Sequence, residues 1–385
     1  MFAERTRWDL DPNRLSQALA RVRSEAKPVL DLTVSNPTAC GFVFDSESIL
    51  KSLANPAALR YEPDPRGLEV ARRAVAGYYA ERGVVISTEA VFLTTGTSEA
   101  YTYAMRLLCD PGDEVLVPQP SYPLLTFIAG IQDVSLVPYS LVYKDRWQID
   151  FHSIEKAITP RTRAVVVIHP NNPTGNYCGR DEALRLENLC AERGLAILAD
   201  EVFLDFPLDG PTPASFAACT LPLTFVLSGL SKIAGLPQMK AAWMVVGGVE
   251  TARRRALERL ELIADTFLSM NAPIQLAMPA FLGLQRGFQQ QLLSRVRQNL
   301  AELDRRLAGQ SFCRRLAVEG GWYVVLHLDA NQTDEDLAIE LLTTKGVYIH
   351  PGHFYDFAGE GYLVASLICP PAEFAEGIRR LLTLR

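Results

Sequence analysis

The sequence has no apolar run that approaches the roughly 20 residues needed to cross a membrane. Its first residues, MFAERTRWDLDPN, carry charges and a proline where a signal peptide needs an apolar stretch. We therefore expect a cytoplasmic protein with no membrane partner. The 385 residues, of which 48% are hydrophobic and 21% charged, are sufficient for two domains and a large core.

The sequence also lacks an excess of positive charge. It has 38 basic and 44 acidic side chains, which gives a net charge of −6. Its main basic cluster, Arg253–Arg255, is flanked by Glu250, Glu258 and Glu261, as on a solvated helix face. This balance argues against a protein that binds the phosphate backbone of a nucleic acid, so we expect no nucleic-acid partner.

Cysteine and histidine patterns typical of metal sites are missing. The seven cysteines are scattered and never spaced as C-x-x-C, and the five histidines match no zinc spacing. We interpret the cysteines as small buried apolar side chains in a reducing compartment. No metal site is expected.

What the sequence does contain is a series of short apolar runs, each followed by a polar loop and often by a helical pattern. Near-continuous apolar runs are typical of strands buried on both faces of a parallel sheet, with helices outside. We therefore expect an α/β fold with a mostly parallel central sheet. The expected strands are Val91–Leu93, Glu114–Val117, Ala164–Ile168, Leu195–Ala199, Thr224–Leu227 and Trp243–Val246.

The pattern changes near Pro273. A long amphipathic run over Ile274–Leu307 predicts a connecting helix, and the residues after it alternate between short strands and helices. We expect a large domain over residues 46–272 and a smaller α+β domain over residues 273–385. The first 45 residues are too short to fold alone, so they are expected to join the smaller domain.

Polar side chains that suit pyridoxal phosphate (PLP) follow the expected strands. Ligands of such sheets gather where loops leave the carboxyl ends of strands. PLP requires a lysine for a Schiff base, a carboxylate beside the pyridine nitrogen, and amides at a helix start with a cation for the phosphate. The candidates are Lys232, Asp200 closing LAILA, Asn172 in NNPTG, Gly96, Thr97 and Ser98 opening a helix, Tyr122 in PSYP, and Lys240.

Each of these features is weak evidence by itself. A lone lysine after serine is usually a surface residue, and an aspartate at a strand end often makes structural contacts. The NNPTG segment is a common turn and TGTS a common helix start. Their joint order and spacing along the chain is what indicates a cofactor site.

With these motifs the chain resembles the fold-type-I aminotransferases of class I/II, in the aspartate aminotransferase superfamily. The resemblance runs through LTVSNPT (32–38), YEPDPRGL (61–68), TGTSEA, PSYP, HPNNPTG, ADEVF, SGLSKIAGLPQMK and GYLVASL (361–367). It implies a PLP domain of α/β/α type, a smaller domain, and a homodimer with two shared active sites.

The resemblance also implies roles for single residues. Lys232 is the Schiff-base lysine that shuttles a proton between substrate and cofactor, and Asp200 is the partner of the pyridinium nitrogen. The other implied contacts are Asn172 with the ring hydroxyl oxygen, Tyr122 stacked on the ring, and Gly96, Thr97, Ser231 and Lys240 around the phosphate. Tyr61 would reach the phosphate of the neighbouring subunit.

The chain departs from the family pattern at several of these positions. Phe203 stands where a tyrosine usually donates to the ring oxygen, a loss of about 0.5–1.5 kcal/mol that should raise the pKa of the Schiff base. Lys240 replaces the usual phosphate arginine and keeps its charge without the bidentate fork. Ser35 stands where many relatives have glycine near the substrate carboxylate.

The departure with the largest consequence is Val364, at the position of the arginine that grips the substrate α-carboxylate. No arginine occurs between Tyr348 and Glu376. Ser35, Asn36, His327 and His353 are candidates to compensate in part, and His353 in HPGHFYDF is a further candidate substrate contact. We expect a weaker dependence on the α-carboxylate, unless an arginine from elsewhere in the sequence reaches the same point.

Three functions remain to be compared. The first is a ping-pong aminotransferase that passes an amino group from an amino acid or amine to a 2-oxo acid. The second is a C–S lyase or another β-eliminating PLP enzyme, which would use the same core motifs. The third is a non-catalytic PLP-binding module of a transcription regulator, for which the segment before Leu32 is too short to hold a winged helix. The sequence does not identify the amino donor or acceptor.

Overall fold

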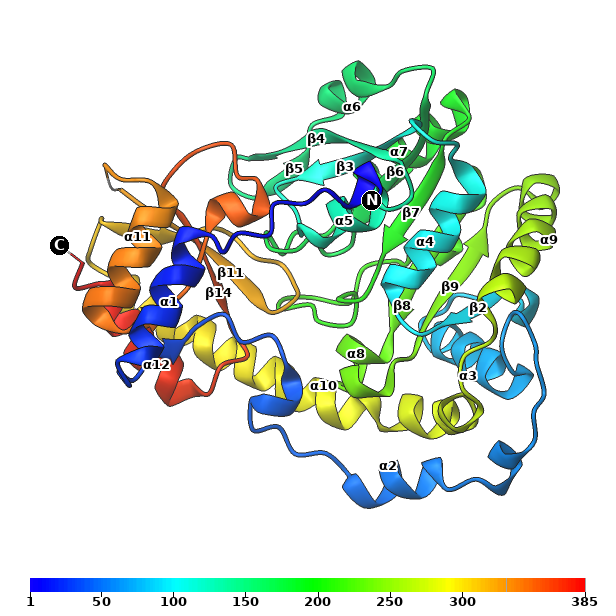
Figure 1. Cartoon of the computed structure of the whole chain (residues 1–385), viewed down its shortest axis with the longest axis horizontal. Helices are drawn as coiled ribbons and strands as arrows, with labels where there is room; N and C mark the ends of the chain where they lie inside the picture. Colours follow the sequence, from blue (N-terminus) through cyan, green and yellow to red (C-terminus); the bar gives the residue numbers. More distant parts are fainter. Residues whose placement is uncertain (330, 385) are drawn as a thin grey trace.

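A computed structural model describes residues 1–329 and 331–384. Its main feature is an eight-stranded sheet in the order β2-β9-β8-β7-β6-β3-β4-β5 (Figure 1). The pairs β3–β4, β3–β6, β6–β7 and β7–β8 are parallel, and β2–β9, β8–β9 and β4–β5 are antiparallel. The strands are β2 (Val91–Thr94), β3 (Glu114–Gln119), β4 (Ser135–Tyr143), β5 (Trp147–Ile149), β6 (Thr162–Ile168), β7 (Ala196–Asp200), β8 (Thr224–Gly229) and β9 (Ala242–Gly247). The predicted α/β class with a mostly parallel central sheet is confirmed.

Helices cover both faces of this sheet, as its apolar strands require. Successive side chains of β6 alternate between two cores, with Val165 and Val167 on one face and Ala164 and Val166 on the other. One core is closed by α3 (Glu69–Ala80), α6 (Phe151–Ala157), α7 (Arg180–Arg193) and the first part of α10 (Ala272–Leu307). The other core is closed by α4 (Thr97–Leu108), α5 (Leu124–Gly130) and α9 (Glu250–Phe267).

A smaller antiparallel sheet in the order β10-β11-β14-β13 forms a separate core. Its strands are β10 (Cys313–Arg315), β11 (Tyr323–Leu328), β13 (His350–Pro351) and β14 (Tyr362–Ser366). The helices around it are α1 (Arg14–Ser24), the second part of α10, α11 (Asp334–Glu340) with the π-helical turn Leu341–Lys345, and α12 (Pro371–Leu381). This is the smaller sheet region that the sequence predicted after a long helix.

The N-terminal segment pairs with the C-terminal part of the chain. Strand β1 (Leu30–Asp31) runs parallel to β12 (Val347–Tyr348), and α1 packs on α11. Helix α10 spans both regions, because Phe281 lies in the core of the large sheet and Leu292 in the core of the small one. The domain limits at residues 45 and 272 stay a prediction.

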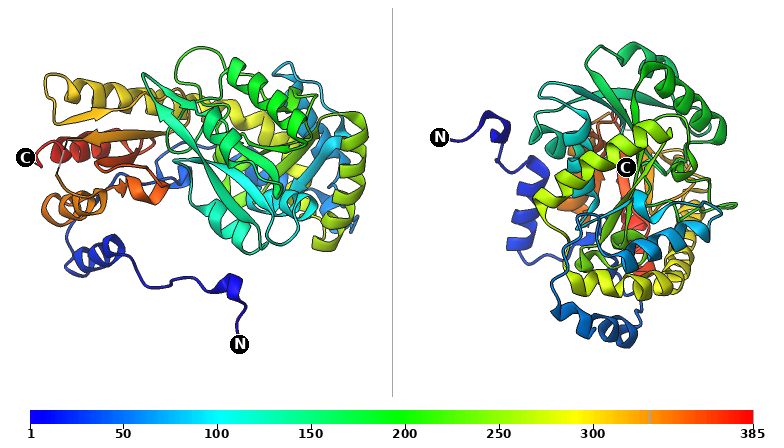
Figure 2. Two further views of the ribbon diagram at one scale, coloured as in Figure 1. Left: turned by 90° about the horizontal axis from the view of Figure 1, so that it is seen from above. Right: turned by 90° about the vertical axis from the view of Figure 1, so that its right-hand side faces the viewer.

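The first thirteen residues run along the outside of the molecule from α1 toward α5 (Figure 2). Arg5 forms an ion pair with Asp133, and the Trp8 ring meets the Phe127 ring edge-on, with 6.0 Å between the ring centroids. The remaining helices are α2 (Ser46–Leu53) and the one-turn α8 (Leu230–Ile233). None of the helices in the described ranges is long and apolar enough to cross a membrane.

Candidate active site

A pocket of about 520 Å³ lies beside the carboxyl ends of β6, β7 and β8, a volume in the range of about 300–1,000 Å³ usual for small-molecule and cofactor sites. Two features explain its position: β6, β7 and β8 run parallel, and polar loops follow them. Most of the predicted site residues line it: Ser35, Gly96, Thr97, Ser98, Tyr122, Asn172, Asp200, Phe203, Ser231, Lys232 and Lys240.

Lys232 projects into this pocket from α8, immediately after β8. Glycine is needed at position 229, because a Cβ there would lie 2.8 Å from the Cβ of Ala242 on the adjacent strand β9. The Lys232 Nζ lies 4.6 Å from the centroid of the Trp322 ring and 5.5 Å from that of Phe203. Burial lowers the pKa of Lys232 to about 8, and the charge of Asp200 opposes this shift. A larger fraction of neutral amine makes the lysine a better nucleophile toward a carbonyl.

Asp200 ends β7 with a partly buried carboxyl group. One oxygen, Oδ2, accepts a hydrogen bond from the Tyr101 hydroxyl at 3.1 Å, and Oδ1 accepts one from the Val202 N–H at 3.1 Å. Burial raises the pKa of Asp200 to about 6, against these hydrogen bonds and the charge of Lys232. A carboxylate in such a place is stabilised by a nearby cation, which a protonated pyridine nitrogen would supply.

The first turn of α4 lines the pocket and could hold an anion. The N–H groups of its first residues have no acceptor inside the helix, and the helix dipole favours a negative charge there. A Cβ built on Gly96, the residue that precedes the helix, would meet nothing within 4 Å, so the backbone here is open to a ligand. Ser231 and Lys240 line the same pocket and supply a hydroxyl and a positive charge.

Asn172 provides a further sign of a bound group. Its side chain is 8% exposed, and its Oδ1 atom is buried without a hydrogen-bond partner among the described residues. A buried amide with an unpartnered atom is costly, and a bound group that hydrogen-bonds to this amide, as the ring oxygen of PLP would by accepting from its N–H, would reduce that cost. The donor set therefore fits PLP at the lysine, ring-nitrogen, ring-oxygen and phosphate positions. Phe203 is buried with its ring edge-on to Trp322, at 4.8 Å between centroids, and offers no hydroxyl to the ring oxygen.

Four residues named from the sequence do not line this pocket, and one of them, His327, lies in β11 with its ring against Tyr362. Tyr61 is 81% exposed on the surface of the single chain. Asn36 uses its side chain locally, because Oδ1 accepts hydrogen bonds from the N–H and the hydroxyl of Thr38 at 3.1 and 2.8 Å. His353 is exposed in the 3-10 turn Gly352–Tyr355 and packs on Phe354. Asn36 and His353 are thus not among the residues that line the pocket of their own chain.

Sequence reasoning missed several residues that do lie at the site. Tyr101 sits one turn after Thr97 on α4, and this spacing could have indicated that it faces the same way. Tyr323, His350 and Tyr355 come from the smaller sheet and the turn after it, and they line the pocket. No local pattern in the sequence places them there.

Val364 occupies the place where the family pattern has an arginine. It is 1% exposed in β14, opposite Val325 of β11 and His350 of β13. Among the described residues that line the pocket there is no arginine. The lysines among these described lining residues are Lys232 and Lys240.

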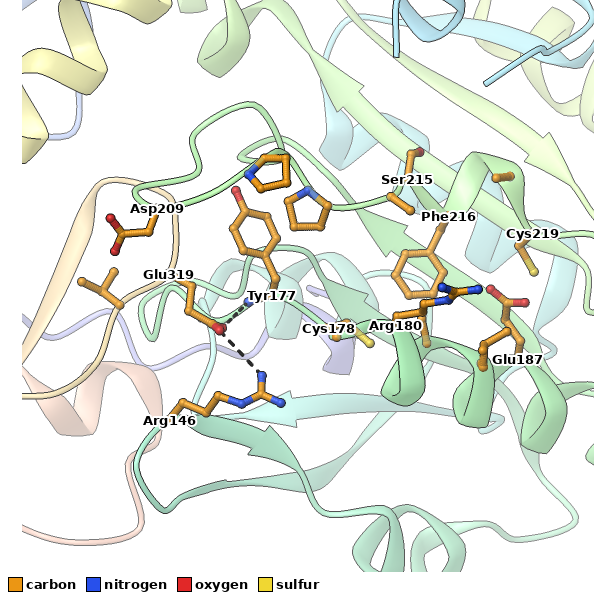
Figure 3. Close-up of a pocket in the computed structure, with 18 residues that line it drawn as sticks. Arg146, Tyr177, Cys178, Arg180, Glu187, Asp209, Ser215, Phe216, Cys219 and Glu319 are labelled. Atoms are coloured by element: carbon orange, nitrogen blue, oxygen red, sulfur yellow. Dashed lines mark hydrogen bonds and ion pairs between the residues drawn. The ribbon is translucent and has the colours of Figure 1, made fainter. Parts of the chain in front are cut away.

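A second, larger hollow of about 920 Å³ lies elsewhere, between the start of α7 and the loop before β8 (Figure 3). Two of its charged lining groups are paired with each other, since Glu319 accepts a hydrogen bond from the Tyr177 N–H at 3.0 Å and lies 3.6 Å from Arg146. It contains none of the predicted cofactor residues. Size alone would favour this hollow, but the chemistry of the side chains favours the smaller pocket.

Known proteins of similar sequence are aminotransferases. The family description "Aminotransferase class I and II" matches residues 7–381. The glutamate-pyruvate aminotransferase AlaA of Escherichia coli K12 is 32% identical over a match that covers 68% of this chain and 65% of that protein. An alanine aminotransferase of Mycobacterium bovis is 30% identical, with 95% of this chain and 87% of that protein covered.

Solved structures share the fold over almost the whole chain. An aminotransferase from Escherichia coli superposes with a TM-score of 0.88 at 25% identity, covering 99% of this chain and 96% of that one. The alanine aminotransferase of Pyrococcus furiosus gives a TM-score of 0.90 at 23% identity, with coverage of 99% and 98%. Fold and pocket together define a PLP-dependent enzyme of fold type I. The chain belongs to the class I and II aminotransferases, whose cofactor is PLP.

Proposed function

We propose that this protein transfers an amino group from an amino acid or amine to a 2-oxo acid by a ping-pong mechanism, with Lys232 as the covalent anchor of PLP. The observation that supports this proposal best is the placement of Lys232 and Asp200 in one pocket, both partly buried and both with shifted pKa values. Shifted titratable groups in a cleft are typical of catalytic sites.

Each residue has a part that follows from its position. PLP supplies an electron sink for the negative charge that develops at the substrate Cα. Asp200, oriented by Tyr101 and Val202, holds the proton on the ring nitrogen. Lys232 has a pKa near enough to neutrality to take a proton from the substrate Cα and return it. The cofactor would be held in position by Asn172, Ser231, Lys240 and the start of α4.

The relatives suggest which substrates to try first. Their names refer to glutamate, pyruvate and alanine. We propose L-alanine and L-glutamate as the first donors to test, with pyruvate and 2-oxoglutarate as acceptors. No observation favours β-elimination, and the same assay detects it as release of ammonia with pyruvate from a donor with a leaving group on Cβ.

We also propose a homodimer in which Tyr61 reaches the phosphate of the partner subunit. Its exposure on the single chain supports this role, because a tyrosine that is 81% exposed has room for a partner. The cytoplasmic location remains a prediction from composition.

The test of the anchor is the Lys232→Ala variant. Borohydride reduction of the wild-type holoenzyme should fix PLP to the peptide that contains Lys232, as read by mass spectrometry. The variant should lose this linkage and nearly all turnover, whereas Lys240→Arg should keep both. Reduction that still labels the Lys232→Ala variant would show that another lysine is the anchor.

A further inference from the structure

Among the described residues, the pocket lining contains no arginine but does contain a histidine and several tyrosines. Lys232, Lys240 and Asp200 are engaged with the cofactor in the proposed function, on which this inference rests. What remains to meet a substrate carboxylate are neutral hydrogen-bond donors. Such donors among the lining residues include His350, Tyr323, Tyr355 and Ser35.

His350 occupies a special position among them. In the small sheet its Cα partner is Val364, the residue at the place of the missing arginine. Directly opposite residues of antiparallel strands present their side chains on the same face, about 5 Å apart. The imidazole of His350 therefore lies beside Val364, the position at which the family pattern has an arginine.

The ring of His350 is held in one orientation. Its Nδ1 lies 3.1 Å from the hydroxyl oxygen of Tyr355, and the rings of Phe354 and Tyr348 pack at 5.7 and 6.0 Å between centroids. Burial lowers the pKa of His350, against the charge of Asp31, which favours the neutral ring at neutral pH.

The pair keeps one hydrogen-bond donor in either tautomer. If the Tyr355 hydroxyl donates to Nδ1, the proton on Nε2 is left to donate. If Nδ1 carries the proton and donates to the tyrosine oxygen, the hydroxyl proton of Tyr355 is left instead. Both side chains line the pocket, so a donor is available there in both cases.

The geometry points to His350, positioned by Tyr355, as the residue that binds the substrate carboxylate in place of the family arginine. A single neutral donor holds a carboxylate less firmly than a bidentate guanidinium does. The enzyme thereby retains a preference for amino acids over the corresponding amines, but a smaller one than an arginine clamp confers.

The experiment compares the best L-amino acid donor among the twenty with the amine formed from it by decarboxylation. For each, kcat and KM of the first half-reaction are measured by stopped-flow absorbance of the holoenzyme. A second measurement is the Kd of the deaminated acid of the same donor, which has the carboxylate but no amine to react, from its effect on the cofactor spectrum. The variants are His350→Leu, His350→Gln and Tyr355→Phe, and His353→Leu is the matched control outside the pocket.

We expect His350→Leu to raise the KM for the amino acid and the Kd of the deaminated acid by about 10- to 100-fold, the usual effect of losing a hydrogen bond to a charged group. The kinetics of the amine should stay within about threefold, the scatter of a variant without that contact. His350→Gln, which keeps an N–H donor, should recover most of the loss, and Tyr355→Phe should show part of it. His353→Leu should behave as the wild type.

Equal losses for the amino acid and the amine in His350→Leu would overturn the inference, because they would indicate only a structural role. Unchanged kinetics, or a wild-type preference for the amino acid of many thousandfold that survives the substitution, would overturn it as well. These results are distinct from a failure of the proposed function. In that case the borohydride linkage at Lys232, or amino transfer by the wild type, would itself be missing.

Discussion

At the scale of single residues, the site depends on burying two groups that water would keep charged. Burial lowers the pKa of Lys232 and raises that of Asp200, so the two pKa values approach pH 7 from opposite sides. The carboxylate then depends on its hydrogen bonds and on a cationic ring nitrogen to stay ionised. The catalytic effect of Asp200 should therefore depend on its charge more than on its shape.

The Asp200→Asn variant tests this dependence. The amide can still accept from Tyr101 or Val202, but it cannot hold a proton on the ring nitrogen. We expect turnover to fall by about three orders of magnitude or more, with only a modest loss of PLP affinity. Single-turnover absorbance measures the first quantity and equilibrium dialysis of PLP the second. A near-normal rate would mean that another acid protonates the ring.

Phe203 should give the cofactor an unusual pH profile. The position is buried beside Trp322 and has no hydroxyl to stabilise the anionic ring oxygen. In Phe203→Tyr the new donor would favour the deprotonated Schiff base, so the pKa read from absorbance titration of the holoenzyme should fall. The shift should be about 0.4–1 unit, which corresponds to one hydrogen bond. An unchanged or higher pKa would contradict this account.

At the scale of elements, the backbone conformation of the turns that carry the cofactor residues restricts which amino acids can occupy them. Gly175 in NNPTG has φ +70°, and a Cβ there would lie 2.8 Å from the carbonyl oxygen of Gly320 and 2.4 Å from the Val318 side chain. The N–H groups of Glu319 and Gly320 donate to the Gly175 carbonyl oxygen at 3.0 and 2.8 Å. This turn therefore links the loop that carries Asn172 to the segment that leads into β11.

The Gly175→Ala variant should be destabilised more than a Gly→Ala variant at a position with a similar backbone conformation but no close neighbours. Gly112 is the control, because its φ is +86° and a Cβ would meet nothing within 4 Å. Both variants incur the strain of a left-handed residue, about 1–2 kcal/mol. The clash at position 175 should add about 1–3 kcal/mol to the loss in free energy of unfolding, measured by urea denaturation. Equal losses in the two variants would show that the turn can move away from Gly320.

At the scale of the whole molecule, the proposed function requires one pocket residue, Tyr61, that the single chain does not supply. The pocket residues come from both sheets, and α10 connects the two cores around which they are built. Tyr61, on the segment between α2 and α3, does not reach the pocket of its own chain. A second copy of the chain is the partner that the proposed function requires.

Mixing two inactive variants tests the shared site. Tyr61→Ala should weaken PLP binding in every site of its homodimer, and Lys232→Ala should abolish catalysis in every site of its own. After the two are denatured and refolded together, mixed dimers contain one site with Lys232 from one chain and Tyr61 from the other. Activity at limiting PLP should then rise above the sum of the two parents. No rise, with dimers present by light scattering, would show that Tyr61 does not act across the interface.

The sequence by itself determined six of the eight strands of the large sheet, all but β4 and β5, and most of the residues that line the pocket. Lys232, Asp200 and Asn172 each follow an apolar run whose two-sided burial is evident locally, and parallel pairing brings the carboxyl ends of β6, β7 and β8 to one edge. Lys232, Asp200 and Asn172 needed no further information, because strand, turn and functional side chain are adjacent in the chain. The long helix after residue 272 was equally clear from its period.

Only the tertiary structure decided which side chains of the smaller sheet reach the site. The sequence favoured His353, whereas the structure places His350 at the pocket. The two lie three residues apart, and the choice between them depends on the pairing of the two-residue strand β13 with β14. Register in such a short strand is determined by contacts with distant strands rather than by local pattern, and a shift of one residue reverses every side chain. The hydrogen bond from Tyr101 to Asp200 was likewise decided by the tertiary structure, since it joins a helix to a strand almost a hundred residues away.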